Sequence, residues 1–325
     1  MTEVGTCCVA GLGNRGARDS RLTSARSMPE AARLGAIDLL RGICALAVFA
    51  FHEAYQLPVQ HAVPWQSLLG PITRFGFLGV PIFFMISGYV ISKSAESRTR
   101  LQFAASRAGR LLPGFWMALS LTLVVLLLMG AVPPVATIAA NFIIVATWFR
   151  QPYVDGVYWS LTAEIFFYGA VMALAVGSGF RPRMRCLSTA WMMLTVGNWF
   201  VHIPAAVILN FPWAPYFAIG IFMYFFVSEG WRGDMLMLLT SGAIAGVQTF
   251  IYQRQFGGST VPFCLNAAFV MEVGAALLFI LQGCRLSHGM QRVAIVVGAM
   301  SYPLYLIHDV LGTVVMTTLY GISPG

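Results

Sequence analysis

The chain has 325 residues, of which 58% are hydrophobic and only 10% are charged, and its mean hydropathy is +0.76. Soluble domains carry roughly a quarter charged residues, so this composition excludes a water-exposed globular protein. The formal net charge of +8 is compatible with a polyanionic partner, but the positions of the basic residues indicate a membrane topology instead.

Apolar stretches that are long enough to cross a membrane recur along the sequence, separated by short polar links. We predict nine spans, at residues 35–56, 76–94, 111–130, 157–178, 187–208, 213–228, 234–252, 262–282 and 293–320. The apolar stretch 135–149 is short and follows prolines, so we interpret it as an interfacial or re-entrant segment. The expected fold class is therefore all-α, a polytopic transmembrane helical bundle of about nine to ten spans.

Residues 1–33 form a polar, Arg- and Gly-rich segment without the apolar core of a secretory signal. We expect a disordered basic cytoplasmic tail, with Met28 as an alternative start. If the N-terminus is cytoplasmic, sixteen basic residues fall on that side and three on the other, namely Arg74, Arg150 and Arg254. This asymmetry predicts orientation rather than a nucleic-acid partner. The six cysteines show neither a pairing pattern nor metal-ligand spacing, so we predict no disulfide and no metal site.

The first span contains two ionisable residues, Arg41 and His52, with Asp38 one turn before Arg41. Eleven positions are close to three helical turns, about 16 Å of rise, so these side chains share one face at two depths. An ionisable residue in the bilayer is a candidate functional residue because its burial is costly. The alternative is an arginine that reaches the lipid headgroups and an interfacial histidine.

Two arginines follow the second span, Arg107 and Arg110, and their i, i+3 spacing places both on one face of a helix. Guanidinium groups bind phosphate in a bidentate manner, which suits a nucleotide-like cofactor, but membrane anchoring explains the pair equally well. Within the second span, Ser87-Gly88 is typical of a close helix approach, and it also leaves room for a ligand.

The fourth span begins with Trp159, typical of an outer aromatic belt, and carries Glu164 about a turn deeper. Glu164 lies four residues from both Ser160 and Tyr168, on one stripe of the helix. This carboxylate can pair with Arg41, orient His52, or tie helices together, and the sequence leaves these alternatives open.

In the last span, Ser301, Tyr305 and His308 follow one another at i, i+4 and i+7. Their polar ends therefore share a face that should look into the bundle. A structural hydrogen-bonded ladder explains the pattern as well as a catalytic group does.

Taken together, these segments resemble the acyltransferase 3 family, the bacterial membrane O-acyltransferases that modify surface polysaccharides, Nod factors and some antibiotics. The resemblance covers roughly residues 35–310, within a membrane domain expected at 34–325. Its motifs, weak singly but in the family's order, are Ile37-Asp38-Leu-Leu-Arg41-Gly42 with His52, Gly79-Val80…Phe83-Phe84…Ser87-Gly88-Tyr89, Arg107-x-x-Arg110 before Pro113, Trp159-Ser160-Leu161…Glu164…Phe167-Tyr168, and Ser301-Tyr302-x-Leu304-Tyr305-Leu306-x-His308.

The resemblance implies an integral protein of the bacterial inner membrane with a cytoplasmic N-terminus. It implies transfer of an acyl group, usually acetyl, from cytoplasmic acyl-coenzyme A (acyl-CoA) to a hydroxyl of a glycan or lipid-linked oligosaccharide. Four functional residues carry over by position: Arg41, His52, Arg107 and Arg110. We expect the last two, together with Arg41, to bind the donor. His52 is then a general base or a transient acyl carrier.

Glu164 is a third catalytic candidate beside Arg41 and His52. The expected supporting residues are Asp38, Ser87, Trp159, Ser301, Tyr305 and His308. Family members usually have about ten spans, so a chain ending at Gly325 is expected to lack the last helix. Two other readings are a polytopic transporter or flippase, and an inactive assembly partner in polysaccharide export.

Overall fold

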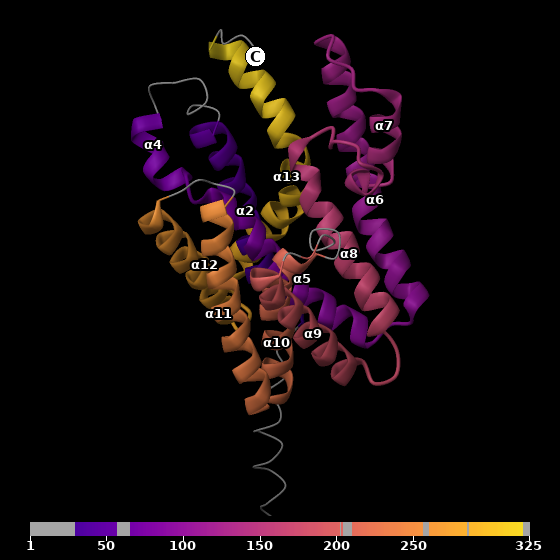
Figure 1. Ribbon diagram of the computed structural model, residues 1–325, viewed down its shortest axis with the longest axis vertical. Helices are drawn as coiled ribbons and strands as arrows, with labels where there is room; N and C mark the ends of the chain where they lie inside the picture. The colour runs from indigo at the N-terminus through magenta and orange to yellow at the C-terminus, as the bar shows by residue number, and fades with distance from the viewer. Residues whose placement is uncertain are drawn as a thin grey trace, which may run out of the picture.

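The computed structural model describes residues 30–56, 66–201, 203, 210–255, 260–284 and 286–320. Within these residues the chain is helical and contains no strand, which confirms the predicted all-α bundle (Figure 1). The disordered tail was expected at residues 1–33. Residues 1–29, which include the alternative start at Met28, lie outside the described residues, whereas residues 30–33 belong to the first helix.

The α-helices, in chain order, are α2 (Glu30–Phe51), α4 (Gln66–Thr73), α5 (Gly79–Glu96), α6 (Arg100–Leu128), α7 (Val135–Phe142), α8 (Trp159–Leu174), α9 (Phe180–Phe200), α10 (Ala214–Glu229), α11 (Arg232–Gln255), α12 (Val261–Leu281) and α13 (His288–Tyr320). Short turns of other helix types adjoin them: the π-helical η1 (His52–Gln56) and the 3-10 turns η2 (Gly76–Leu78), η3 (Ala146–Phe149), η4 (Gly156–Tyr158) and η5 (Phe211–Trp213).

In the described part of the chain, eight helical segments are long and apolar enough to cross a membrane, and they coincide with eight of the nine predicted spans. The remaining prediction, 187–208, falls on α9, which begins earlier, at Phe180, and carries three arginines in its first two turns. The segment 135–149 forms two short helices, α7 and η3, and neither has the length of a span.

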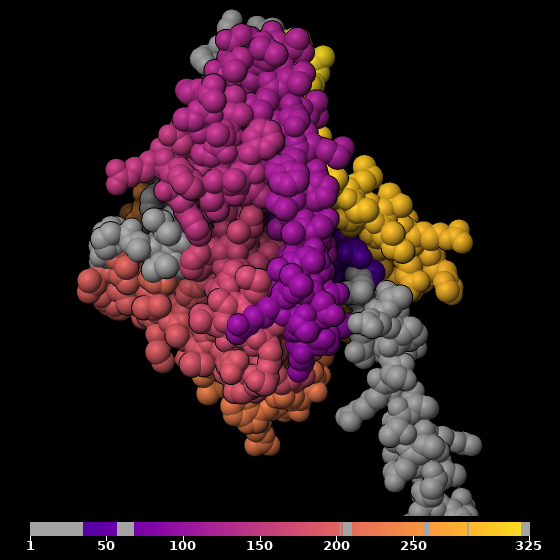
Figure 2. Space-filling view, turned by 90° about the vertical axis from the view of Figure 1, so that its right-hand side faces the viewer, coloured from indigo at the N-terminus to yellow at the C-terminus, as the bar shows by residue number. Residues whose placement is uncertain are grey.

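Helix α6 begins eleven residues before the predicted span at 111. Thr99 and Gln102 form a capping box there, in which each side chain bonds the backbone N–H of the other residue. The turns that carry Arg107 and Arg110 are therefore continuous with the apolar part of the helix. In the space-filling view, α6 runs as a column along one face of the molecule, beside part of α13 (Figure 2).

Two pairs of helices form the centre of the bundle: α5 with α10, and α2 with α13. At the α5–α10 crossing, the missing side chain of Gly88 leaves room for the carbonyl of Phe217, and that of Gly220 leaves room for the carbonyl of Met85. This agrees with the close helix approach predicted at Ser87-Gly88.

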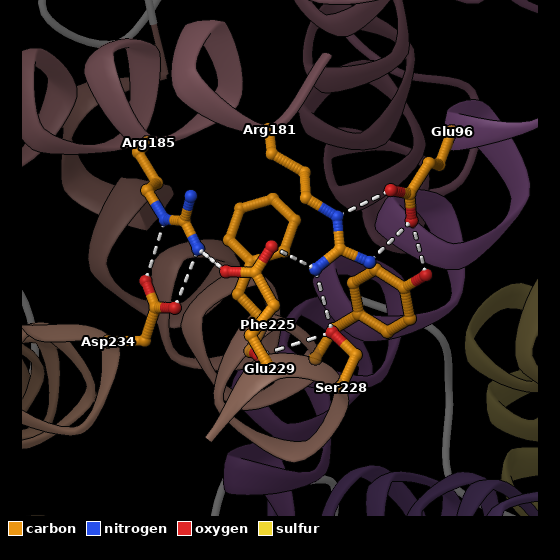
Figure 3. A network of polar contacts seen from close by, with 8 residues as sticks. Glu96, Arg181, Arg185, Phe225, Ser228, Glu229 and Asp234 are labelled. Carbon is orange, nitrogen blue, oxygen red and sulfur yellow. Dashed lines mark hydrogen bonds and ion pairs between the residues drawn. The ribbon is translucent and has the colours of Figure 1, made fainter. Parts of the chain in front are cut away.

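An ion-pair network ties the ends of α5, α9, α10 and α11 together (Figure 3). Arg181 binds Glu96 through its Nε at 2.5 Å and Glu229 through its Nη1 at 2.6 Å. Arg185 donates two hydrogen bonds to the fully buried Asp234, at 2.8 and 2.7 Å, and one to Glu229. The bonds to Asp234 are the main cause that raises the pKa of Arg185. The network therefore fixes four helices at one end of the bundle.

Candidate functional site

Two cavities lie next to each other inside the bundle and share two lining residues, Val80 and Tyr305. We name them the arginine cavity and the histidine cavity. The arginine cavity is lined by Arg41, Ser87, Arg107, Arg110, Glu164 and Ser301, among others. The histidine cavity is lined by His52, Arg74, Trp159, Trp213, Tyr252 and Asp309, among others. Water-sized molecules could occupy a volume of about 70 Å³ in the arginine cavity and about 700 Å³ in the histidine cavity.

The arginine cavity has a strongly positive lining. Arg41, near the middle of α2, has no hydrogen-bond or ion-pair partner among the described residues. Arg107 donates to Ser94 at 3.2 Å, while its Nε is buried without a partner in the described structure. Arg110 is exposed. Three guanidinium groups thus face a cavity with one carboxylate, Glu164, and the arrangement is complementary to an anion.

Glu164 links α8 to α5. Its carboxylate accepts a hydrogen bond from Ser87 at 2.9 Å and another from Tyr168 on its own helix. It lines the arginine cavity rather than the cavity of His52. Of the three alternatives that the sequence left open, the contacts favour the tie between helices, with Arg41 close enough for an electrostatic interaction.

The boundary of the two cavities carries a pair of hydroxyl groups. Tyr305 from α13 and Ser160 from α8 are both buried, and their hydroxyl oxygens lie 2.8 Å apart. Ser160 also donates to the carbonyl of Val157 at 3.0 Å. Tyr305 lines both cavities and Ser160 lines the arginine cavity, so the pair is fixed next to the boundary.

His52 begins the π-helical turn η1, where α2 widens at its end. Its Nδ1 lies 3.4 Å from the Oδ1 of Asp309 on α13. A carboxylate on Nδ1 favours the tautomer with hydrogen on that nitrogen, which leaves Nε2 free to accept a proton. π-turns inside α-helices are frequent at functional sites, and this one places an imidazole–carboxylate pair at a cavity wall.

His308 packs beside this pair, with its ring centroid 4.9 Å from that of His52. Its Nδ1 lies 2.7 Å from the carbonyl oxygen of Tyr305. Because a carbonyl only accepts, Nδ1 carries the hydrogen, and the buried Nε2 is left as an acceptor without a partner in the described chain. His308 thus forms part of the packing behind His52 and lines neither cavity.

Asp155 and Gly156, just before α8, support Asp309 from the other side. The buried carboxylate of Asp155 accepts hydrogen bonds from the backbone N–H groups of Val157 at 3.1 Å and Val310 at 3.3 Å. Burial, assisted by the nearby charge of Asp309, raises the pKa of Asp155 to about 7. A Cβ added at Gly156 would lie 2.7 Å from Asp309 Oδ2. Any other residue at this position would therefore force the carboxylate of Asp309 to move.

The structure distributes the sequence-predicted residues over both cavities. Ser301 lines the arginine cavity and donates to the carbonyl of Gly298 in its own helix, at 2.7 Å. Asp38 packs against Gly298, outside the residues that line either cavity. Trp159 lines the histidine cavity. The chemical roles assigned to these residues remain predictions.

Sequence reasoning missed two charged residues of the histidine cavity, Asp309 and Arg74. Asp309 was visible as the neighbour of His308, but its pairing with His52 depends on how α13 packs against α2. Arg74 was visible as one of three basic residues on the side opposite the cytoplasmic tail. The small number of basic residues on that side was the feature of the sequence that could have identified Arg74.

A family profile described as an acyltransferase domain matches residues 34–324. The chain is similar to acyltransferase MdmB of Streptomyces mycarofaciens, with 29% identity over 157 residues, covering 43% of this chain and 38% of the relative. It is also similar to exopolysaccharide production protein ExoZ of Rhizobium meliloti (strain 1021), with 29% identity over 152 residues, covering 42% of this chain and 45% of the relative. Each alignment therefore spans less than half of the relative. No solved structure matches the chain.

Proposed function

The chain belongs to this acyltransferase family, and on that premise we propose that it is an integral membrane O-acyltransferase. In this proposal it moves an acyl group, acetyl in the simplest case, from cytoplasmic acyl-CoA to a hydroxyl of a cell-surface or exported glycan. Of the two relatives, one is named an acyltransferase and the other an exopolysaccharide production protein.

The observation that carries the proposal is the pair of cavities that meet at Tyr305. One has a cationic lining, and the other contains an imidazole supported by a carboxylate. A transferase that takes its donor from one side of a membrane and its acceptor from the other requires two such compartments with a shared boundary. The charge asymmetry of the sequence supports the corresponding orientation, with the N-terminus in the cytoplasm of a bacterial cell and the protein in its inner membrane.

The arginine cavity suits the donor. Arg107 and Arg110 would bind its phosphate groups near the exposed end, and the unpartnered Arg41 would bind anionic or polar groups farther inside. The cavity is narrow, which favours a thin chain carrying a thioester over a nucleotide at its inner end. When bound, acyl-CoA supplies an acyl group activated as a thioester.

The histidine cavity suits the acceptor. His52 Nε2 takes the hydroxyl proton while the hydroxyl oxygen forms a bond to the acyl carbon, and the C–S bond then breaks. The proton held by His52 then passes to the thiolate, so the products are an ester and coenzyme A with a free thiol, and the imidazole is neutral again. Asp309 holds the imidazole in the required tautomer and stabilises its protonated form. Ser160 donates its proton to Val157, so Tyr305 is the donor in the hydroxyl pair. The Tyr305 hydroxyl would redirect that proton to the carbonyl oxygen as its negative charge develops.

The direct test uses the purified protein in lipid nanodiscs with isotope-labelled acetyl-CoA and an oligosaccharide acceptor, with mass spectrometry of the sugar. We expect an ester-linked label with the native chain and its loss in His52→Gln. His288→Gln is the matched control, because His288 is exposed and lines neither cavity. Equal labelling by His52→Gln would refute the role of His52 as base. Movement of sugar across a bilayer without labelling would favour the transporter instead.

A further inference from the structure

Arg74 is a cation of the histidine cavity that the proposed chemistry does not use. It lies in the turn between α4 and η2, and its guanidinium carbon is 4.8 Å from the ring centroid of Phe75 and 5.5 Å from that of Phe263. Its Nε is buried and has no hydrogen-bond partner in the described structure. Cation–π contacts of this kind are attractive but satisfy no N–H donor. The guanidinium therefore keeps unused hydrogen-bonding capacity.

The acids nearby do not neutralise this charge. Asp309, which lines the same cavity, is paired with His52. Glu53 is buried against Gly312 and is absent from the cavity lining. Within the described residues, no ion pair includes Arg74. A half-buried cation without an acidic partner is costly to a fold, and an anionic ligand offsets that cost.

The histidine cavity also has aromatic walls. Trp159 and Trp213 lie with ring centroids 4.6 Å apart, and Tyr252 lies 5.3 Å from Trp213. Sugar rings present C–H groups that pack on aromatic faces, while their hydroxyls need polar groups at the rim. With about 700 Å³ open to water, the cavity falls in the usual size range of ligand sites.

These three features identify a class of acceptor. We infer that the histidine cavity takes an acidic saccharide, whose carboxylate or phosphate binds Arg74 while a hydroxyl of the same molecule reaches His52. The inference rests on the proposed transferase function and specifies its acceptor. The planar guanidinium binds either anion with two parallel hydrogen bonds, so Arg74 would both attract the saccharide and fix its orientation.

The first test is a binding measurement that needs no acyl transfer. The detergent-solubilised protein is titrated with a glucuronate-containing oligosaccharide and with the same oligosaccharide after carboxyl reduction, and tryptophan fluorescence is recorded because two tryptophans line the cavity. We expect the acidic form to bind at least tenfold more tightly. Arg74→Gln should abolish that preference and leave binding of the neutral form unchanged, whereas Arg74→Lys should retain part of it. Arg150→Gln, at an exposed arginine outside both cavities, should bind like the native chain.

Competition by inorganic pyrophosphate distinguishes a phosphate group from a uronate carboxylate as the anion that binds Arg74. Competition by pyrophosphate, stronger than by glucuronate alone, would point to the phosphate of a lipid-linked saccharide, and the reverse order would point to a uronate. Equal binding of the acidic and reduced oligosaccharides by the native chain would overturn the inference. An acid preference that persists in Arg74→Gln would also overturn it.

The acyl-transfer assay separates this inference from the proposed function. An acid-selective site in a protein that transfers no label would retain the role of Arg74 and remove the transferase proposal. Transfer to acidic and neutral acceptors with equal KM, unchanged in Arg74→Gln, would retain the transferase and remove the role of Arg74. If both proposals hold, Arg74→Gln raises KM for the acidic acceptor about tenfold with little change in kcat.

Discussion

The hydroxyl of Tyr305 lies 2.8 Å from the hydroxyl of Ser160, at the boundary that the arginine cavity and the histidine cavity share. These residues come from α13 and α8, so the boundary depends on the packing of two helices that are distant in the sequence. Because Ser160 donates its proton to Val157, the Tyr305 proton is the one that can turn to a substrate at this boundary, and it introduces no charge.

Tyr305→Phe should lower kcat for acyl transfer by roughly 10²-fold, because it removes one donor to the developing negative charge. KM for acyl-CoA should change little, since the ring and the cavity walls remain. Steady-state rates with labelled acetyl-CoA measure both constants. Tyr302→Phe is the matched control: that hydroxyl donates to the carbonyl of Leu111 and its side chain lines the arginine cavity alone. Equal losses in both variants would show a packing effect instead.

Arg41→Ala should raise KM for acyl-CoA by about 10- to 100-fold, the effect of losing a charge-assisted hydrogen bond worth about 1.5–3 kcal/mol. Because Arg41 has no ion-pair partner among the described residues, the substitution breaks no ion pair there, and folding should be preserved. Arg292→Ala, at an exposed arginine that lines neither cavity, is the control. An unchanged KM in Arg41→Ala would remove this residue from the donor site.

Gly156→Ala should lower acyl-transfer activity at least tenfold, because the new methyl group would occupy space needed by Asp309 Oδ2. The carboxylate would shift and lose its alignment with His52 Nδ1, while donor binding should remain. Gly169→Ala in α8 provides the comparison, since a Cβ at Gly169 meets nothing within 4 Å. Loss of donor binding along with activity in Gly156→Ala would indicate a general disturbance of the bundle.

The helices, and the placement of Arg107 and Arg110 on one helix face, could be predicted from the sequence because each follows from a local pattern. Apolar length predicts a span, and the i, i+3 spacing of Arg107 and Arg110 places both on one face whatever the neighbouring helices do. The fifth predicted span, 187–208, begins after the arginines, whereas helix α9 starts at Phe180 and includes them. A helix can carry charges in its first turns when acidic residues of other helices bind them, as Glu96 and Asp234 do here.

The pairings across helices could not be predicted, because they depend on relative rotation and depth of packed helices. Glu164 had three candidate roles in the sequence, and the register between α5 and α8 gives it a hydrogen bond from Ser87, which none of them had named. The pairing of His52 with Asp309 likewise requires α13 to lie against α2. A single sequence contains each member of such a pair but not the distance between them.

Arg185→Met should lower the melting temperature more than any other single change in the ion-pair network. It leaves the fully buried carboxylate of Asp234 without its two hydrogen bonds, at a cost on the order of 2 kcal/mol. Arg183→Met, at the exposed arginine two positions earlier, should change the melting temperature little. Thermal unfolding in detergent, followed by tryptophan fluorescence, measures both variants. Equal melting temperatures would mean that water reaches Asp234 and replaces the lost partner.

Asp155→Asn should change how stability depends on pH. Burial raises the pKa of Asp155 from its ordinary 3.8 to about 7, so between these values the folded chain holds a proton that the unfolded chain has released. Stability of the native protein therefore falls as pH rises through this window. Asparagine cannot ionise, so the melting temperature of Asp155→Asn relative to the native protein should be higher at about pH 8 than at about pH 5. Asp309 and His52, whose charges act on Asp155, are present in both proteins. A difference that stays constant with pH would show that Asp155 is ionised throughout, and that Val157 and Val310 hold it as an anion.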